Sequence, residues 1–381
     1  MVGEVKGTSD AQFPFLRQFI EPWYASLADP GRSQEKVLGT LVEGYAKTEY
    51  GREHKASAVD GIDAYRSSFP ISDYRSLLPY IRRVEEGEFE ALLPERAKLW
   101  VMTRGSTGTA KVLPATDTHL SQILEFGARC VVNFALKNDS GVIDAPVLNL
   151  NFPSEVHVMQ TVNGREAYGY SSGTYAKVFP EFQGARLVPA QGEIDALGGG
   201  IARADWERRF ELAYQRAKGE NIGSLMGVTP VMVGFADYVR RRHGARPKEF
   251  WKCKALFCTS VARIHTKYER LLRYHYGPCP VVEMYTATEG VFAQQLDDHP
   301  YVCPNYDGYL FEVATRGGMK MLHELKPFEW GRMVVSTQTL PRYAIGDMVE
   351  SLGKGYFRVF GRDTALTRAE HLLFRLASLR F

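Results

Sequence analysis

The sequence has few of the features that mark specialised classes of protein. Its five cysteines, at positions 130, 253, 258, 279 and 303, are odd in number and never spaced as Cys-x-x-Cys. That pattern argues against a disulfide framework and predicts reduced, mostly buried thiols in a cytoplasmic protein. The nine histidines include no pair at i, i+4 and no His-Glu-x-x-His, so nothing in the sequence indicates a zinc site.

Long hydrophobic runs are missing as well. No apolar stretch approaches the length needed to cross a bilayer, and the start, Met1–Lys6, lacks the apolar core of a secretory signal. An excess of one charge is also lacking, since 47 basic and 44 acidic side chains leave a net charge of +3. We therefore expect neither a membrane nor a nucleic acid as partner. The short basic clusters Arg82–Arg83 and Arg240–His243 are typical of solvated helix ends.

What the sequence does contain is the composition of a folded protein, with 45% hydrophobic and 12% aromatic residues. Its 381 residues suffice for one large or two moderate domains. Residues 1–100 are mainly helical in pattern, with apolar residues at helical spacing in 37–45 and again in 74–81. Residues 99–102 predict a short buried strand, and Thr116 or Asp117 can cap a long helix with an apolar inner face.

From residue 145 to 290 short apolar strands alternate with helix-like stretches. This alternation predicts a largely parallel α/β sheet. The expected strands are 147–150, 225–228, 255–258 and 281–284, and the expected helices lie near 205–217, 231–242 and 262–275. Beyond 305 the segments 309–313, 332–337 and 357–361 predict a smaller β-rich subdomain. Only eighteen residues follow Asp363, too few for another domain.

A glycine-rich segment follows the strand at 99–102. It reads Thr103-Arg104-Gly105-Ser106-Thr107-Gly108-Thr109-Ala110-Lys111. Such a turn can aim backbone N–H groups and hydroxyls at phosphate oxygens, and its lysine can meet their charge. The segment matches neither a Walker A loop nor a dinucleotide fingerprint, and an ordinary polar turn is the alternative. A similar segment at Ser171–Lys177 lacks the second glycine, and we expect it to form part of a substrate pocket or a loop.

Two further segments place acids where a nucleotide could meet them. Tyr285-Thr286-Ala287-Thr288-Glu289 follows an apolar strand, and ligands collect at the carboxyl ends of strands in open α/β sheets. Glu289 suits Mg²⁺ and Tyr285 could stack on a base, although a surface carboxylate is the simpler alternative. Asp347 follows Gly346 within an apolar stretch. Because a buried carboxylate needs hydrogen bonds, two ribose hydroxyls would satisfy it; a turn-capping role is the alternative.

Together these segments resemble the adenylate-forming superfamily, which includes acyl- and aryl-CoA ligases and peptide-synthetase adenylation domains. That family has a Thr-Ser-Gly-Thr-Thr-Gly-x-x-Lys loop, then Tyr-x-x-Thr-Glu, then Tyr-Arg-x-Gly-Asp and Gly-Arg, and here Gly361-Arg362 supplies the last element. The closest likeness is to the GH3-type acyl acid amido synthetases. It rests on Lys36-Val37-Leu38, Thr48–Gly51, Phe69–Tyr74 and Leu78–Ile81, and on Lys111–Thr116 after the loop.

The resemblance implies an α/β fold: a large amino-terminal ATP- and acyl-binding domain over residues 1–362, with mainly parallel sheets flanked by helices and a smaller β-rich subdomain. It implies that a short tail at 363–381 replaces the family's mobile carboxyl-terminal lid. Departures from the family pattern are Arg104, where a small hydroxyl residue is usual, and Ala344, where arginine is frequent.

The resemblance also assigns roles to residues. Lys111, Thr288 and Glu289 would serve catalysis, with Glu289 holding Mg²⁺. The residues that would bind ATP are Thr103, Gly105, Ser106, Thr107, Gly108, Lys111, Thr259, Ser260, Tyr285, Thr288, Asp347 and Arg362. The acyl pocket would lie between the helix starting near Val231 and the strand ending at Cys258-Thr259-Ser260.

The function implied is activation of a small carboxylic acid, apolar or aromatic, as an acyl-adenylate, followed by transfer to an amine to form an amide. Transfer to coenzyme A, as in phenylacetate-CoA ligases, is one alternative. Others are a non-catalytic ATP- or acyl-binding protein without a lid, and an enzyme completed by a lid on a separate chain.

Overall fold

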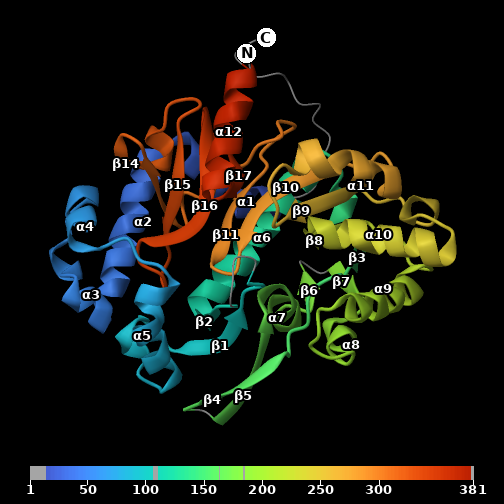
Figure 1. The fold of residues 1–381 in the computed structure, drawn as a ribbon, viewed down its shortest axis with the longest axis horizontal. Coiled ribbons are helices and arrows are strands. Elements are labelled where there is room, and N and C mark those ends of the chain that lie inside the picture. Colours follow the sequence, from blue (N-terminus) through green and yellow to red (C-terminus); the bar gives the residue numbers. More distant parts are fainter. Residues whose placement is uncertain (1–13, 106–109, 163, 183–184, 379–381) are drawn as a thin grey trace.

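Amino-terminal helices lead into the first strand. The structure is a computed structural model, and it describes residues 14–105, 110–162, 164–182 and 185–378 (Figure 1). The first five helices are α1 (Pro14–Ala28), α2 (Pro30–Tyr45), α3 (Glu49–Glu53), α4 (Ile62–Ser68) and α5 (Tyr74–Glu85). The helical spacing predicted for 37–45 and 74–81 is confirmed, since Leu41 and Ile81 point into the core. Asp73 caps α5 by accepting from the Ser76 backbone N–H, and the Ser76 hydroxyl accepts from the Asp73 N–H.

An eight-stranded sheet forms the centre of the molecule. Its strand order is β12-β11-β10-β9-β8-β3-β7-β6, and the block from β10 to β7 is parallel throughout. The bounds are β3 (Val147–Leu148), β6 (Glu181–Phe182), β7 (Ala185–Val188), β8 (Ser224–Val228), β9 (Ala255–Thr259), β10 (Val281–Ala287), β11 (Gly290–Gln294) and β12 (Cys303–Pro304). The predicted parallel sheet and its four strands are confirmed.

Helices cover both faces of this sheet. On one face lies α6 (Asp117–Lys137), which begins where Thr116 accepts from the His119 N–H, as predicted. The opposite face is covered by α9 (Arg203–Ala217), α10 (Thr229–His243) and α11 (Glu269–Tyr276), while α8 (Gln191–Asp195) follows β7. The cluster Arg240–His243 forms the last turn of α10, where positive charge is favourable. No helix in the described ranges is both long enough and apolar enough to cross a membrane.

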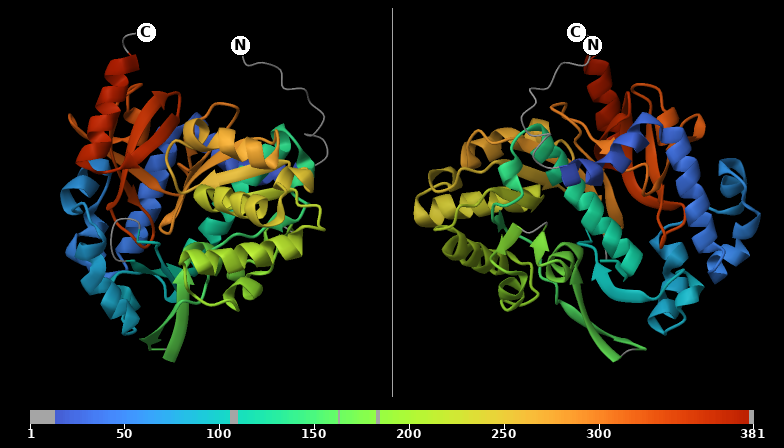
Figure 2. Two further views of the ribbon diagram at one scale, coloured as in Figure 1. Left: turned by 45° about the vertical axis from the view of Figure 1, so that its right-hand side comes forward. Right: turned by 180° about the vertical axis from the view of Figure 1, so that it is seen from behind.

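A second sheet of four strands lies beside α7 (Ser171–Val178). Its order is β2-β1-β5-β4, with β1 (Ala97–Met102), β2 (Val112–Thr116), β4 (His157–Thr161) and β5 (Gly164–Tyr170). The strand β1 confirms the one predicted before the glycine-rich segment. The β4–β5 hairpin extends from the molecule at the end opposite to the carboxyl terminus (Figure 2).

The β-rich subdomain is an antiparallel sheet, as the sequence predicts. Its order is β14-β13-β15-β16-β17, with β13 (Leu310–Thr315), β14 (Gly318–Met321), β15 (Trp330–Ser336), β16 (Tyr343–Gly353) and β17 (Tyr356–Arg362). The segment expected to be a short tail contains a helix, α12 (Ala365–Ser378). It packs back on β17, where the His371 ring stacks on Phe360 at 3.9 Å between ring centroids.

A buried arginine, paired with an acid of this subdomain, joins the subdomain to the amino-terminal helices. Arg342, just before β16, donates to both carboxylate oxygens of Glu312 at 2.9 and 3.2 Å. It also donates to the backbone carbonyl of Phe69 at 2.6 Å. The Ser72 backbone pairs with β16 on both sides of Tyr343, through Arg342 O and Ala344 N. The chain after α4 is thereby fixed to the start of β16.

We predict that Arg342→Ala lowers the free energy of unfolding by about 3–5 kcal/mol, because it leaves Glu312 buried with one cationic partner fewer. Chemical denaturation of both proteins measures this difference. Arg66→Ala is the matched control, since Arg66 also donates to Glu312, at 2.8 Å, but is partly exposed; its loss should be smaller. A loss below about 1 kcal/mol for Arg342→Ala, as for a surface pair, would contradict this prediction.

Candidate active site

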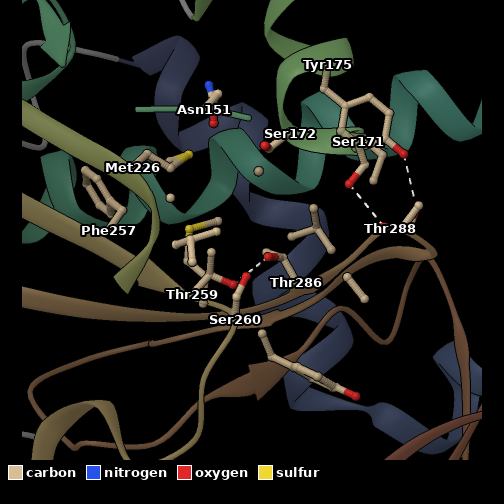
Figure 3. Close-up of a pocket in the computed structure, with 18 of the residues that line it drawn as sticks. Asn151, Ser171, Ser172, Tyr175, Met226, Phe257, Thr259, Ser260, Thr286 and Thr288 are labelled. Atoms are coloured by element: carbon tan, nitrogen blue, oxygen red, sulfur yellow. Dashed lines mark hydrogen bonds between the residues drawn. The ribbon is translucent and has the colours of Figure 1, made fainter. Parts of the chain in front are cut away.

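A cavity of about 670 Å³ opens at the carboxyl ends of the central parallel strands. Its walls come from the segment after β1, from α6 and α7, and from the ends of β8, β9 and β10 (Figure 3). Residues of β16 and β17 close it on the subdomain side. Among the residues proposed from the sequence, those that line it are Thr103, Gly105, Lys111, Thr259, Ser260, Tyr285, Thr288, Glu289, Asp347 and Arg362. The structure thus brings ten candidates together from four distant parts of the chain. Ser106, Thr107 and Gly108 lie outside the described residues.

Lys111 stands where the glycine-rich segment rejoins the sheet. The backbone N–H of Thr103 donates to the Lys111 carbonyl at 2.9 Å, and the Lys111 N–H donates to Thr103 Oγ1 at 3.0 Å, so both ends of the segment are tied together. Gly105 has φ +66°, a left-handed conformation that favours glycine. Lys111 Nζ donates to the Tyr343 hydroxyl at 2.8 Å. The ammonium group is therefore held on the subdomain side of the cavity.

Glu289 occupies a two-residue turn between β10 and β11. Ala287 pairs with Gly290 across the antiparallel strands, which leaves Thr288 and Glu289 at the tip. Glu289 is 5% exposed. Burial raises the pKa of its carboxyl, and the positive charge of Lys111 partly offsets this effect. The acid therefore lies in a setting that disfavours its charged form unless a cation comes near.

Two hydroxyl groups of α7 contact Thr288, and a histidine of α6 contacts one of these hydroxyls in turn. Its Oγ1 lies 3.1 Å from Ser171 Oγ, and its carbonyl accepts from the Tyr175 hydroxyl at 3.1 Å (Figure 3). The Tyr175 hydroxyl lies 3.0 Å from His119 Nε2. Burial lowers the pKa of His119 to about 4, so its ring is neutral near neutral pH. Because the Tyr175 proton goes to Thr288, His119 must donate from Nε2.

Asp347 lies between Arg362 and Tyr285. It pairs with Arg362 across β16 and β17, where Arg362 Nη1 donates to Oδ1 at 2.9 Å, and the Tyr285 hydroxyl donates to Oδ2 at 2.8 Å. Burial raises the pKa of Asp347, and Arg362 opposes this shift. Gly346 has φ +87°, and a Cβ there would lie 2.8 Å from Arg362 Nη2. Glycine at this position therefore makes room for the guanidinium.

Thr259 and Ser260 complete the edge at the end of β9. Thr259 Oγ1 lies 2.5 Å from Thr286 Oγ1 on β10, which joins the ends of the two strands (Figure 3). Ser260 has φ +74°, so the chain turns sharply there. Both residues line the cavity, but no residue of α10 does; the wall facing this edge comes from α6 and α7. Val228, the residue just before α10, does line the cavity, so the expected acyl pocket near the start of this helix stays a prediction.

Other lining residues were proposed only loosely or not at all. The segment Ser171–Lys177, expected in a substrate pocket or a loop, is helix α7, and Ser171, Ser172 and Tyr175 line the cavity. His119 holds Tyr175 in place, yet no motif distinguishes it from a core residue. Tyr343 is the tyrosine of the third motif, but the motif did not predict its contact with Lys111. The apolar face of α6 gives the cavity Ile123, Leu124 and Val131. The helical period showed this face, but a face that lines a cavity has the same pattern as one that packs in a core.

The residues present fit ATP with Mg²⁺. Arg362 Nε is buried and has no hydrogen-bond partner in the described structure, so the subdomain side of the cavity offers a donor beside Asp347. Glu289 supplies one carboxylate, and no cluster of three metal-type ligands occurs within the described ranges. Mg²⁺ in nucleotide sites is typically held by one or two carboxylates together with the phosphates. This donor set suits it.

Comparison with solved structures identifies the fold. The structure resembles that of AtGH3.15 acyl acid amido synthetase in complex with 2,4-DB, with a TM-score of 0.74 and 14% sequence identity; the match covers 96% of this chain and 72% of that one. It also resembles 2-hydroxyisobutyryl-CoA ligase, with a TM-score of 0.61 and 14% identity over 86% of this chain and 74% of that one. The chain has the fold of the adenylate-forming enzymes.

In sequence, part of the chain is similar to GH3 proteins. Residues 20–178 match the GH3 family N-terminal domain. A stretch of 96 residues is 27% identical to indole-3-acetic acid-amido synthetase GH3.2 of Arabidopsis thaliana, and it covers 25% of this chain and 18% of that protein. The chain thus matches less than a fifth of the length of this curated relative.

We predict that Glu289→Gln raises the free energy of unfolding of the ligand-free protein at neutral pH, because it removes a buried carboxylate whose pKa burial raises. The folded state binds the proton more tightly than the unfolded state. The advantage of glutamine should therefore be largest above the folded-state pKa and disappear below the ordinary glutamate range of about 4.3. Denaturation curves across pH measure it. Equal stability of both proteins at every pH would contradict the prediction.

Proposed function

We propose that this protein activates a carboxylic acid with ATP to form an acyl-adenylate and then transfers the acyl group to an amine, giving an amide. One observation carries this proposal. Lys111, Glu289 and the Asp347–Arg362 pair come from separate segments and line one cavity at the carboxyl ends of parallel strands, where α/β proteins bind ligands.

In the first step the substrate carboxylate attacks the α-phosphorus of ATP and pyrophosphate leaves. No protein side chain needs to form a covalent bond, so positioning and charge neutralisation do the work. Asp347 and Arg362 would hold the ribose, with Tyr285 beside the base. Lys111 would move from Tyr343 to the phosphates, together with the hydroxyls of Ser106 and Thr107 and the backbone at Gly108. Thr288 would contact the α-phosphate.

Glu289 would hold Mg²⁺, which neutralises phosphate charge when bound. The raised pKa of Glu289 fits this role, because a cation is what makes its charged form favourable. Arg104 adds a further positive charge at the cavity, where its guanidinium lies 5.5 Å from the Phe152 ring centroid. It could add a phosphate contact or crowd the loop.

The second part of the proposal concerns the molecule that accepts the acyl group. GH3-likeness favours an amine, whereas the fold shared with 2-hydroxyisobutyryl-CoA ligase supports coenzyme A as the alternative acceptor. We assign ATP and acyl binding to residues 1–362. A mobile lid, on a separate chain or elsewhere, would help to place the acceptor. The scattered cysteines fit a cytoplasmic location.

ATP–pyrophosphate exchange with a panel of acids tests the first step. Lys111→Ala should lower the acid-dependent exchange about 10²–10³-fold, because it removes a cation from the developing charge. Asp347→Ala should lower it about 10–100-fold through loss of charge-assisted hydrogen bonds. Lys98→Ala is the control, since Lys98 on β1 is exposed and lies outside the cavity. Exchange that survives in Lys111→Ala would contradict the assignment.

Two further measurements separate the alternatives. Product analysis with amino acids or coenzyme A as acceptor decides between amide and thioester. Binding of Mg·ATP without any exchange would favour the non-catalytic protein or one that needs a lid from another chain, and exchange restored by an added lid domain would favour the latter.

A further inference from the structure

The part of the cavity farthest from the nucleotide residues is a slot between α6 and the central sheet. Along α6 the lining residues are Ile123, Leu124, Gly127 and Val131, all on one face of the helix. Eight residues separate Ile123 from Val131, which corresponds to about 12 Å at 1.5 Å per residue. Gly127 lies midway and has no side chain to narrow the slot.

The central sheet gives a second, independent estimate of the length of the slot. Ser224, Met226 and Val228 alternate along β8, and all three line the cavity. Four residues of strand correspond to about 13 Å at 3.3 Å per residue. Phe257 on β9 and Met284 on β10 line the same side of the slot as these residues of β8. Figure 3 shows Met226 and Phe257 side by side. Helix and sheet thus give similar depths.

One end of the slot opens at the proposed reaction centre. The amino-terminal turn of α6 carries His119, which reaches Thr288 through Tyr175. The strand ends meet there as well, at Thr259 and Thr286. The other end is closed by the residues that follow α6, Val142 at the end of η3 (Ser140–Val142), then Ile143, and Val147 on β3. A carboxylate at Thr288 would therefore direct its hydrocarbon part toward Val142.

Charged groups are missing from this slot. Its lining from α6, η3, β3 and β8, with Phe257 and Met284, contains no acidic or basic side chain among the described residues. Glu283, next to Met284 on β10, also lines the cavity, but its carboxylate lies on the other face of the strand, 3.7 Å from His265 Nε2. Ser224, 3% exposed, carries the hydroxyl at the deep end. Asn149, at the side, donates its amide to Pro189 O at 3.1 Å and to Gln191 Oε1 at 3.3 Å, so it is already engaged. A polar substituent placed deep in the slot would lose its hydration with little in return.

We propose that the acid is an elongated, unsubstituted apolar monocarboxylic acid, and that Val131, Val142 and Ile143 set the longest chain accepted. This inference rests on the proposed function and names its substrate class. A fully extended chain advances about 3.3–3.6 Å per three bonds, so a slot of about 12–13 Å holds on the order of ten methylene carbons. Short hydroxy acids, dicarboxylic acids and amino acids would leave most of the slot unfilled or place polar groups in it.

Binding without ATP tests the slot separately from catalysis. Isothermal titration of the full chain with straight-chain acids of about four to twelve carbons should show affinity rising about fourfold per methylene. The rise should stop at a length on the order of ten carbons. Hydroxylation at the far end of the best acid should cost at least tenfold. Affinity that does not depend on length, or that is highest for the shortest acids, would overturn the proposal.

Matched variants test which residues end the slot. Val131→Leu adds about one methylene group at its deep end and should shorten the preferred acid by about one or two carbons. Val132→Leu makes the same change on another face of α6, where Val132 packs with Ile20 and Trp23 outside the cavity. It should leave the preferred length unchanged. Ile143→Phe provides a second blocking variant at a partly exposed position, in case Val131→Leu folds poorly.

Two outcomes keep this inference distinct from the proposed function. Length-dependent binding without pyrophosphate exchange would support the slot and count against adenylation. Exchange with short or hydroxylated acids, without preference for long ones, would support adenylation and overturn the slot. A preferred length that shifts equally in Val131→Leu and Val132→Leu would also overturn it.

Discussion

The position of β16 depends on the buried ion pair between Arg342 and Glu312, and the candidate active site depends on β16. The pair lies where the amino-terminal helices meet the β-rich subdomain, and Arg342 also binds the carbonyl of Phe69. From this anchored start the strand presents Tyr343 to Lys111 and, four residues later, Asp347 to Tyr285 and Arg362. A single strand therefore sets the distance between the residues proposed for phosphate and for ribose.

Several buried polar groups of the site destabilise the folded protein when no ligand is bound. Glu289 and Asp347 are buried acids whose pKa burial raises, while Lys111 and Arg362 lie near enough to offset part of that effect. Arg362 Nε remains buried without a partner in the described structure. Groups left in this condition are found where a ligand completes the hydrogen bonding. The buried acids and the unpaired Arg362 Nε therefore make the ligand-free protein less stable than it would be with a ligand bound to these groups.

Much of the fold could be predicted from the sequence, because strands such as β8 and β9 are short apolar runs and α2 and α6 have a clear helical period. Local chemistry alone narrowed the cap of α6 to Thr116 or Asp117, and the structure shows that it is Thr116. The role of α6 was not, since Ile123 and Val131 have the same pattern whether they face a core or a cavity. Helix α7 was missed because its serines and glycine suggest a turn. Helix α12 was missed because eighteen residues were judged only as too short for a domain.

The site was predicted where side-chain chemistry is unusual for its setting, as at Lys111, Glu289 and Asp347. The contacts were not predicted where one residue acts through another, as Tyr343 does for Lys111 and Tyr175 does for Thr288, although both tyrosines lie in segments that the sequence analysis named. Such residues depend on which segments meet in space. A single sequence contains that information only through the whole fold, so periodicity and motifs could not reveal them.

The turn between β10 and β11 limits how this region can vary. Thr288 and Glu289 form a two-residue connection between antiparallel strands, so the hydrogen-bond register on both sides fixes where the acid lies. One residue more or fewer in the turn would change that register and reverse the faces of the side chains that follow. This part of the chain should tolerate a change of residue type far better than a change of length.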